Sequence, residues 1–179
     1  MRRRWVRSAL VIAIALTCYY SWICYRVPAY YGFGNWWTIA RADSVLLYRI
    51  DSLKYREGAR SIEQMAIAGP IKPKDQWVDQ VVTLLGDSRN YSWDIAKACA
   101  MMPGVALRFK KGESTTDVRF CFECRMLSIG QDSGRAKAED FDPMNDELIE
   151  LMKEALPKDP VIQSLTYYHR LKQERQRRR

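Results

Sequence analysis

Three cysteines in the middle of the 179-residue chain are the residues whose types and spacing could best support chemistry. Cys121 and Cys124 form a C-x-x-C pair, and Cys99 lies upstream of them. Such a set can ligate a metal, act as a redox dithiol or form a structural disulfide. We expect no cofactor, and zinc bound by Cys99, Cys121 and Cys124 is the alternative. A zinc site would need a fourth ligand, and His169, the only histidine, lies far along the chain.

The strand pattern around the C-x-x-C pair indicates which sulfurs can meet. Side chains alternate between the two faces of a strand, so Cys121 and Cys124 point to opposite faces. They could bond each other only if the chain turned sharply at residues 123–125, where there is neither Gly nor Pro. If the domain is exported, a disulfide from Cys99 to Cys121 or to Cys124 is favoured. Buried free thiols are the other interpretation.

No other residues form a convincing catalytic set. His169 stands beside Arg170 without a nucleophile pattern, so we expect it on the surface. An acidic cluster lacks the register of a calcium loop, and we expect it to cap a helix and face solvent. This cluster comprises Glu139, Asp140, Asp142, Asp146 and Glu147. An enzymatic activity is therefore not favoured.

The N-terminal segment indicates where the protein is located. Four arginines within residues 2–7 precede an uncharged, largely apolar run over residues 8–25, with aromatic residues at its far end. As a helix the run would measure about 27 Å, the lower limit for a bilayer core. We predict that residues 1–25 are a basic flank and a transmembrane signal-anchor helix. The N-terminus would be cytoplasmic and the rest exported, periplasmic or extracellular, at a bacterial envelope.

Several alternatives to an uncleaved anchor stay open. Small residues at Val27 and Ala29 allow secretion after signal cleavage near Tyr30, although Arg26 and Pro28 are unfavourable there. Lipidation at Cys18 and an ordinary buried helix of a soluble protein are the other two.

The charge pattern argues against a nucleic-acid binder. The net charge is +8, of which the N-terminal arginines supply four and the tail supplies five, so the body is nearly neutral. A nucleic-acid reader would carry its basic residues as a patch on the folded surface. Residues 169–179 are expected to be a disordered basic tail, with attachment to an anionic surface as the alternative. That surface would bind Arg170, Lys172, Arg175, Arg177, Arg178 and Arg179.

The order of the predicted elements indicates the fold class. We expect residues 26–42 to be a juxtamembrane connector and residues 43–168 to form one small α+β domain. Strands are predicted at residues 44–50 and, with a helix as the alternative, at 61–68. The clearest β-region is predicted over residues 104–129. It comprises a hairpin with one apolar face, whose opposite face carries Arg119, and a third short strand at residues 126–129.

Helices are predicted where apolar residues recur at helical spacing. One spans residues 75–85, and two more begin at Asp142-Pro143 and Asp159-Pro160, where an aspartate can cap the helix. A short helix is also expected at residues 95–101, and residues 51–60 are expected to form a loop. These elements favour an antiparallel sheet covered by helices on one face.

The stretch over residues 82–91, the Ala98-Cys99 dipeptide and the residues 103–109 and 118–127 resemble a group of small uncharacterised bacterial proteins. Members have a similar tyrosine turn, a cysteine before the hairpin, a CF-x-C strand and an Asp-Pro-opened helix. The resemblance covers roughly residues 43–165 and implies no known activity. It implies that the three-cysteine arrangement is a shared feature of the domain.

Two function classes follow. The favoured hypothesis is a membrane-anchored protein with an exported α+β domain that serves in interaction or scaffolding, with an unknown protein partner. The alternative is a metal-binding or thiol-redox domain that uses Cys99, Cys121 and Cys124.

Overall fold

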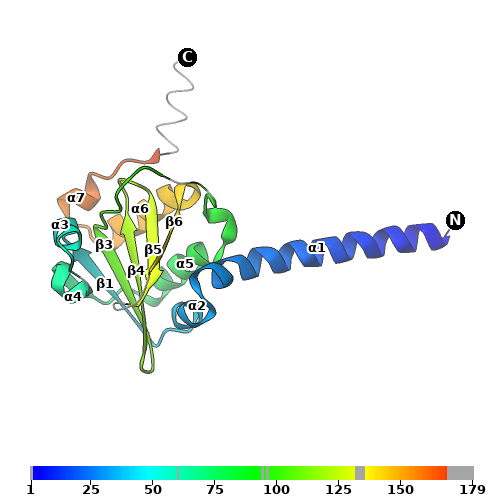
Figure 1. Cartoon of the computed structure of the whole chain (residues 1–179), viewed down its shortest axis with the longest axis horizontal. Helices are drawn as coiled ribbons and strands as arrows, with labels where there is room; N and C mark the ends of the chain where they lie inside the picture. The colour runs from blue at the N-terminus through cyan, green and yellow to red at the C-terminus, as the bar shows by residue number, and fades with distance from the viewer. Residues whose placement is uncertain (1, 60, 94, 96, 132–135, 169–179) are drawn as a thin grey trace, which may run out of the picture.

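The structure is a computed structural model that describes residues 2–59, 61–93, 95, 97–131 and 136–168. It has the predicted α+β class, with one antiparallel sheet and helices packed against it (Figure 1). The predicted basic tail at residues 169–179, including His169, lies outside the described residues.

The sheet has six strands in the order β2-β1-β3-β4-β5-β6, and all neighbouring strands are antiparallel. The predicted strand over residues 44–50 and the predicted hairpin are confirmed as β1, β3 and β4. The fourth residue pair of the hairpin register places Arg108 opposite Asp117. The strands are β1 (Ser44–Ile50), β2 (Ala66–Ile71), β3 (Val105–Lys111), β4 (Ser114–Cys121), β5 (Met126–Gly130) and β6 (Lys137–Asp140).

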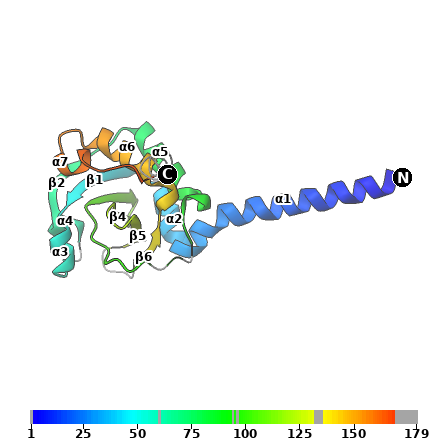
Figure 2. The same ribbon diagram turned by 90° about the horizontal axis from the view of Figure 1, so that it is seen from above.

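Helices α5 (Asp75–Gly86), α6 (Asn145–Ala155) and α7 (Pro160–Gln163) lie along one face of the sheet (Figure 2). The helix predicted at residues 75–85 is confirmed as α5. Asp159 caps α7 as predicted, because its carboxylate accepts hydrogen bonds from the N–H groups of Val161 and Ile162. Ahead of α6, residues Asp142–Met144 form a short 3₁₀ turn, η2, rather than the first turn of the α-helix.

The main core lies between this face of the sheet and the helices. Apolar side chains of β3 and β4 alternate toward it, as their period-2 pattern predicts. α5 and α6 each contribute one apolar stripe to this core. The fully buried residues of the main core include Leu107, Phe109, Val118, Phe120, Val81, Leu85, Leu148 and Met152.

The opposite face of the sheet is also buried, which the sequence did not predict. Ile62 and Met65, from the short helix α4 (Ile62–Met65), pack there with Tyr48, Ile50 and Ala106. The prediction of a sheet covered on one face is wrong at this point, because α4 folds back over β1 and β3. Periodicity within a strand cannot reveal a cover that comes from another segment.

Three segments between the strands differ from their predictions. Residues 61–68 contain both proposed structures, since α4 is followed directly by β2. Residues Ser52–Arg56 form a short helix, α3, which the Asp51 side chain caps by accepting from the N–H of Leu53. The predicted helix at residues 95–101 is absent from the described part of that segment. A further 3₁₀ turn, η1, spans Ser88–Asn90.

The N-terminal helix α1 (Arg2–Tyr31) projects away from the domain (Figures 1 and 2). Among the described residues, no helix is both long enough and apolar enough to cross a bilayer. Residues 26–42, expected as a connector, instead form the end of α1 and the helix α2 (Phe33–Ala40). Trp36 packs on the domain, and an added Cβ at Gly86 would stand only 2.9 Å from it.

Candidate functional site

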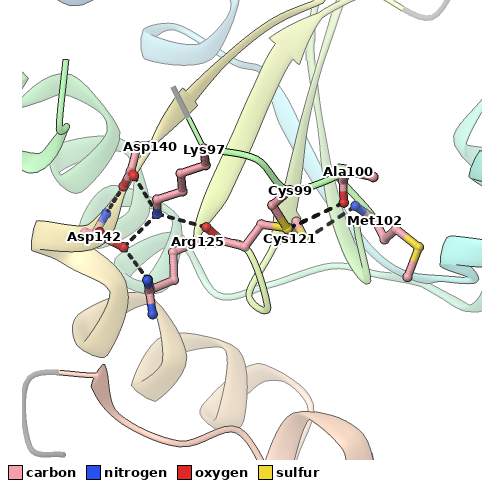
Figure 3. The surroundings of a disulfide bond; sticks show 9 residues. Lys97, Cys99, Ala100, Met102, Cys121, Arg125, Asp140 and Asp142 are labelled. Atoms are coloured by element: carbon pink, nitrogen blue, oxygen red, sulfur yellow. Dashed lines mark hydrogen bonds and ion pairs between the residues drawn. A yellow bond between two sulfur atoms is a disulfide. The ribbon is translucent and has the colours of Figure 1, made fainter. Parts of the chain in front are cut away.

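The three cysteines lie at one end of the β4–β5 hairpin. Cys121 ends β4, Cys124 lies in the turn before β5, and Cys99 lies in the segment that leads into β3. Cys99 and Cys124 form a disulfide, with their Cα atoms 6.0 Å apart (Figure 3). Cys121 is a buried free thiol, and its Sγ atom accepts a hydrogen bond from the Met102 N–H at 3.4 Å. The structure thus contains one of the two pairings that the sequence left open.

The turn that carries Cys124 depends on Arg125. This residue has a φ of 53°, in the left-handed region that non-glycine residues rarely adopt. Its backbone carbonyl accepts from the Phe141 N–H at 2.9 Å, and its Nε donates to an oxygen of Asp142. Its guanidinium also lies 4.0 Å from the centre of the Tyr168 ring. The expectation that the strand runs on through residue 124 is wrong, because tertiary contacts stabilise a turn without glycine.

Lys97 connects the segment of Cys99 to this turn. Its Nζ atom lies 2.5 Å from an oxygen of Asp140 and 2.9 Å from an oxygen of Asp142, and it donates to the Cys124 carbonyl at 2.9 Å (Figure 3). The Asp140 side chain is 1% exposed, so the ammonium supplies the counter-charge that a buried carboxylate requires. The prediction that the acidic cluster faces solvent is therefore wrong for Asp140, and also for Glu139, which is buried in β6.

The chemistry available here is that of a cross-linked and ion-paired turn. Among the described residues, no group of three or more His, Cys, Asp or Glu side chains is arranged to hold a metal ion. While Cys99 and Cys124 are bonded to each other, neither sulfur is a thiolate, the form that binds metals and attacks disulfides.

A second cluster of charges lies on the opposite face of the sheet. Arg108 donates two hydrogen bonds to the Asp117 carboxylate, at 2.8 and 2.9 Å, and Arg119 donates a third at 3.1 Å. All three side chains are at most 7% exposed. This cluster was not predicted from the sequence. The hairpin register could have revealed it, because it places the three residues on one face of neighbouring strands.

The junction between α1 and the domain is a third feature. Val27 and Tyr31, in the last turns of α1, are buried in the main core. The Tyr30 hydroxyl donates to the Ala138 carbonyl at 3.0 Å, and the Arg26 guanidinium lies 4.5 Å from the centre of a Trp93 ring. α1 is therefore joined to the domain by core packing and not by a loop.

Two tyrosines at this junction are held in their neutral form. Burial is the main cause that raises the pKa of Tyr31 and of Tyr91 above the ordinary value of 10.0, and the nearby Glu139 adds to both shifts. The Tyr91 hydroxyl donates to the Leu85 carbonyl at 2.7 Å. Their uncharged rings can thus serve as core residues at physiological pH.

Comparisons with protein-family models, with curated proteins and with solved structures found no match.

Removing the disulfide should destabilise the domain. Its two cysteines are 25 residues apart, and the chain-entropy model gives about 3.5 kcal/mol for a loop of this length. We expect the variants Cys99→Ser and Cys124→Ser to lower the free energy of unfolding by about this amount, measured by urea denaturation. Cys24→Ser, which changes an exposed free cysteine of α1, is the matched control.

Mass spectrometry of the unreduced protein, with metal analysis, tests the cysteine chemistry itself. A cross-linked peptide that joins Cys99 to Cys124 is expected. One zinc per chain with three protected thiols would support the metal-binding alternative. Three freely alkylated thiols without metal would contradict both the disulfide and the metal site.

Proposed function

We propose that the protein is a membrane-anchored interaction or scaffolding protein with an exported α+β domain and no catalysis of its own. One observation carries this proposal. The uncharged segment at residues 8–25, preceded by four arginines, belongs to a single helix that projects from the domain and ends inside its core. Such a helix would hold the domain at a membrane surface without a flexible linker.

The side chains on the projecting part of α1 support a lipid environment. Ile12 and Ile14 are 60% and 54% exposed, and Trp22 is 63% exposed. Burying these side chains in a bilayer would remove their apolar surface from water. Trp22 and its neighbour Tyr25 lie toward the domain end, where aromatic rings favour the headgroup level.

The core contacts of α1 favour an anchor that stays attached. Cleavage after Ala29 would remove Val27, which is fully buried, and Arg26, which packs on Trp93. Signal cleavage would therefore cost the domain part of its core. We accordingly propose the uncleaved anchor over the secreted form.

An exported location also fits the disulfide, because disulfides persist in oxidising compartments. The arginine asymmetry around residues 8–25 sets the proposed orientation, with a cytoplasmic N-terminus. The basic residues of the tail, beyond residue 168, would then lie outside the cytoplasm, where they could contact an anionic surface.

Membrane fractionation with charge-insertion variants tests the anchor. We expect the full-length protein in the membrane fraction and the double variant Ile12→Arg/Ile14→Arg largely in the soluble fraction. Each arginine costs roughly 2.5–3.5 kcal/mol at the centre of a spanning helix. The domain should keep its unfolding temperature, since both side chains are exposed on the projecting helix.

Leu53→Arg is the matched control, because it adds the same charge at an exposed position of α3. It should leave the protein in the membrane fraction. If wild type and double variant partitioned alike, residues 8–25 would not be the anchor.

A further inference from the structure

A cavity of about 260 Å³ lies between the β4–β5 turn, helix α6 and the chain that follows α7. Phe122, Glu123 and Arg125 line it from the turn, and Asn145 and Ile149 line it from α6. It plays no part in the membrane attachment proposed above.

Asn145 supplies a buried, unused hydrogen-bond acceptor at the wall of this cavity. Its side chain is 2% exposed, and its Nδ2 group donates to an oxygen of Asp146 at 3.1 Å. Its Oδ1 atom has no hydrogen-bond partner within the described ranges of the chain. Because buried polar atoms are nearly always paired, this oxygen calls for an N–H or O–H donor from a bound molecule.

Arg125 supplies a fixed positive charge on the same cavity. Its Nε is bonded to Asp142, and its guanidinium plane lies over the Tyr168 ring at 4.0 Å. Among the described residues, hydrogen bonding of this guanidinium is found only at Nε, so its two Nη groups can donate to a ligand. Paired donors of this kind match a carboxylate.

The remaining wall is partly apolar. Phe122 and Ile149 offer surface to an apolar group, and the exposed Glu123 stands at the rim. A ligand that satisfies all of these features carries a carboxylate, a nearby N–H and an apolar side chain.

We propose that this cavity binds the C-terminal residue of a peptide. The carboxylate would accept hydrogen bonds from the Nη groups of Arg125, the amide N–H would donate to Oδ1 of Asn145, and an apolar side chain would contact Phe122 and Ile149. A free apolar amino acid has the same chemistry, with its ammonium group placed near Glu123. This inference rests on the proposed interaction function and names the ligand class for it.

The test measures fluorescence anisotropy with the full-length protein in detergent micelles. The probe is a fluorescein-labelled peptide Gly-Ser-Gly-Ser-Leu with a free C-terminus, compared with the same peptide as its C-terminal amide. We expect saturable binding of the free acid. The affinity for the amide should be at least about tenfold lower than that for the free acid, since a charge-assisted pair is lost. Equal affinities, or no binding of either peptide, would overturn the proposal.

Two variants and one competitor refine the result. Asn145→Leu should weaken binding about tenfold, because the amide N–H of the ligand then lacks its acceptor. The variant also loses the Nδ2 hydrogen bond to Asp146, so circular dichroism is used to check that it is folded before binding is compared. Gln80→Leu, on α5 outside the cavity, should bind as wild type does. Unchanged binding by Asn145→Leu would contradict the assignment. Free leucine that competes as well as the unlabelled peptide would support the same site with an amino acid as its ligand.

Failure of the peptide test is distinguishable from failure of the proposed function. The anchor is judged by membrane fractionation, which does not involve the cavity.

Discussion

Asp117→Ala is expected to leave the domain largely unfolded at 37 °C. Asp117 is fully buried and is the shared acceptor for Arg108 and Arg119. Its removal leaves two buried guanidinium groups without that counter-charge, and breaking a buried pair typically costs about 3–5 kcal/mol. Domains of this kind have about 5–15 kcal/mol of stability in total. Urea denaturation followed by near-ultraviolet circular dichroism would measure the loss.

Two comparisons show whether burial of the charges is the cause. Asp43→Asn removes an exposed carboxylate that pairs with Lys111, and the unfolding midpoint should hardly change. The triple variant Arg108→Met/Asp117→Leu/Arg119→Met removes all three charges together and should recover much of the stability. A midpoint for Asp117→Ala equal to that of wild type would contradict the buried cluster.

Phe120→Ala should be about as damaging. The Phe120 ring is fully buried, and its centre lies 6.2 Å from those of Phe122 and Phe141. Truncating a buried phenylalanine costs about 3–5 kcal/mol, from lost apolar contact and the cavity left behind. The same urea titration measures this value.

The control for Phe120→Ala is Leu53→Ala, an equally apolar residue that is 57% exposed. It should cost less than about 1 kcal/mol, in the range usual for surface substitutions. Similar losses for the two variants would show that Phe120 is not a core residue.

The alternation in β4 predicts the surroundings of one face of this strand correctly and those of the other face wrongly. It correctly places Val118 and Phe120 toward the main core. It also indicates a solvated position for Arg119, where substitution by alanine is expected to cost under about 1 kcal/mol. The structure contradicts that expectation, because Arg119 is 4% exposed and bonded to Asp117. The period of a strand separates its faces but does not tell what covers the second one.

Elements with strong local signals were predictable, and those fixed by distant contacts were not. β1 and α5 follow from β-branched content and from helical spacing. β6 escaped because the sequence from Lys137 to Asp140 has no strand pattern, and its place depends on pairing with β5. The continuation of α1 to Tyr31 was not predicted, because the buried residues in its last turns pack against the domain, and such long-range contacts leave no local pattern.

The residues of the candidate site were predictable, but the contacts between them were not. The sequence identified Cys99, Cys121 and Cys124 but could not choose between two pairings, because the choice depends on the turn at Arg125. The conformation at Arg125 depends on a hydrogen bond to Asp142, which belongs to a later segment of the chain. The cavity beside Asn145 combines the turn with α6, so no local pattern indicates it.

The measurement that most directly tests the central claim is the topology of the full-length chain. A reporter enzyme that becomes active only after export, fused after Arg179, should be active in cells. A second reporter that works only in the cytoplasm should be inactive at the same position. Sequencing of the purified N-terminus should find no cleavage near Tyr30. Activity of the cytoplasmic reporter alone would contradict the proposal of a membrane-anchored, exported interaction domain.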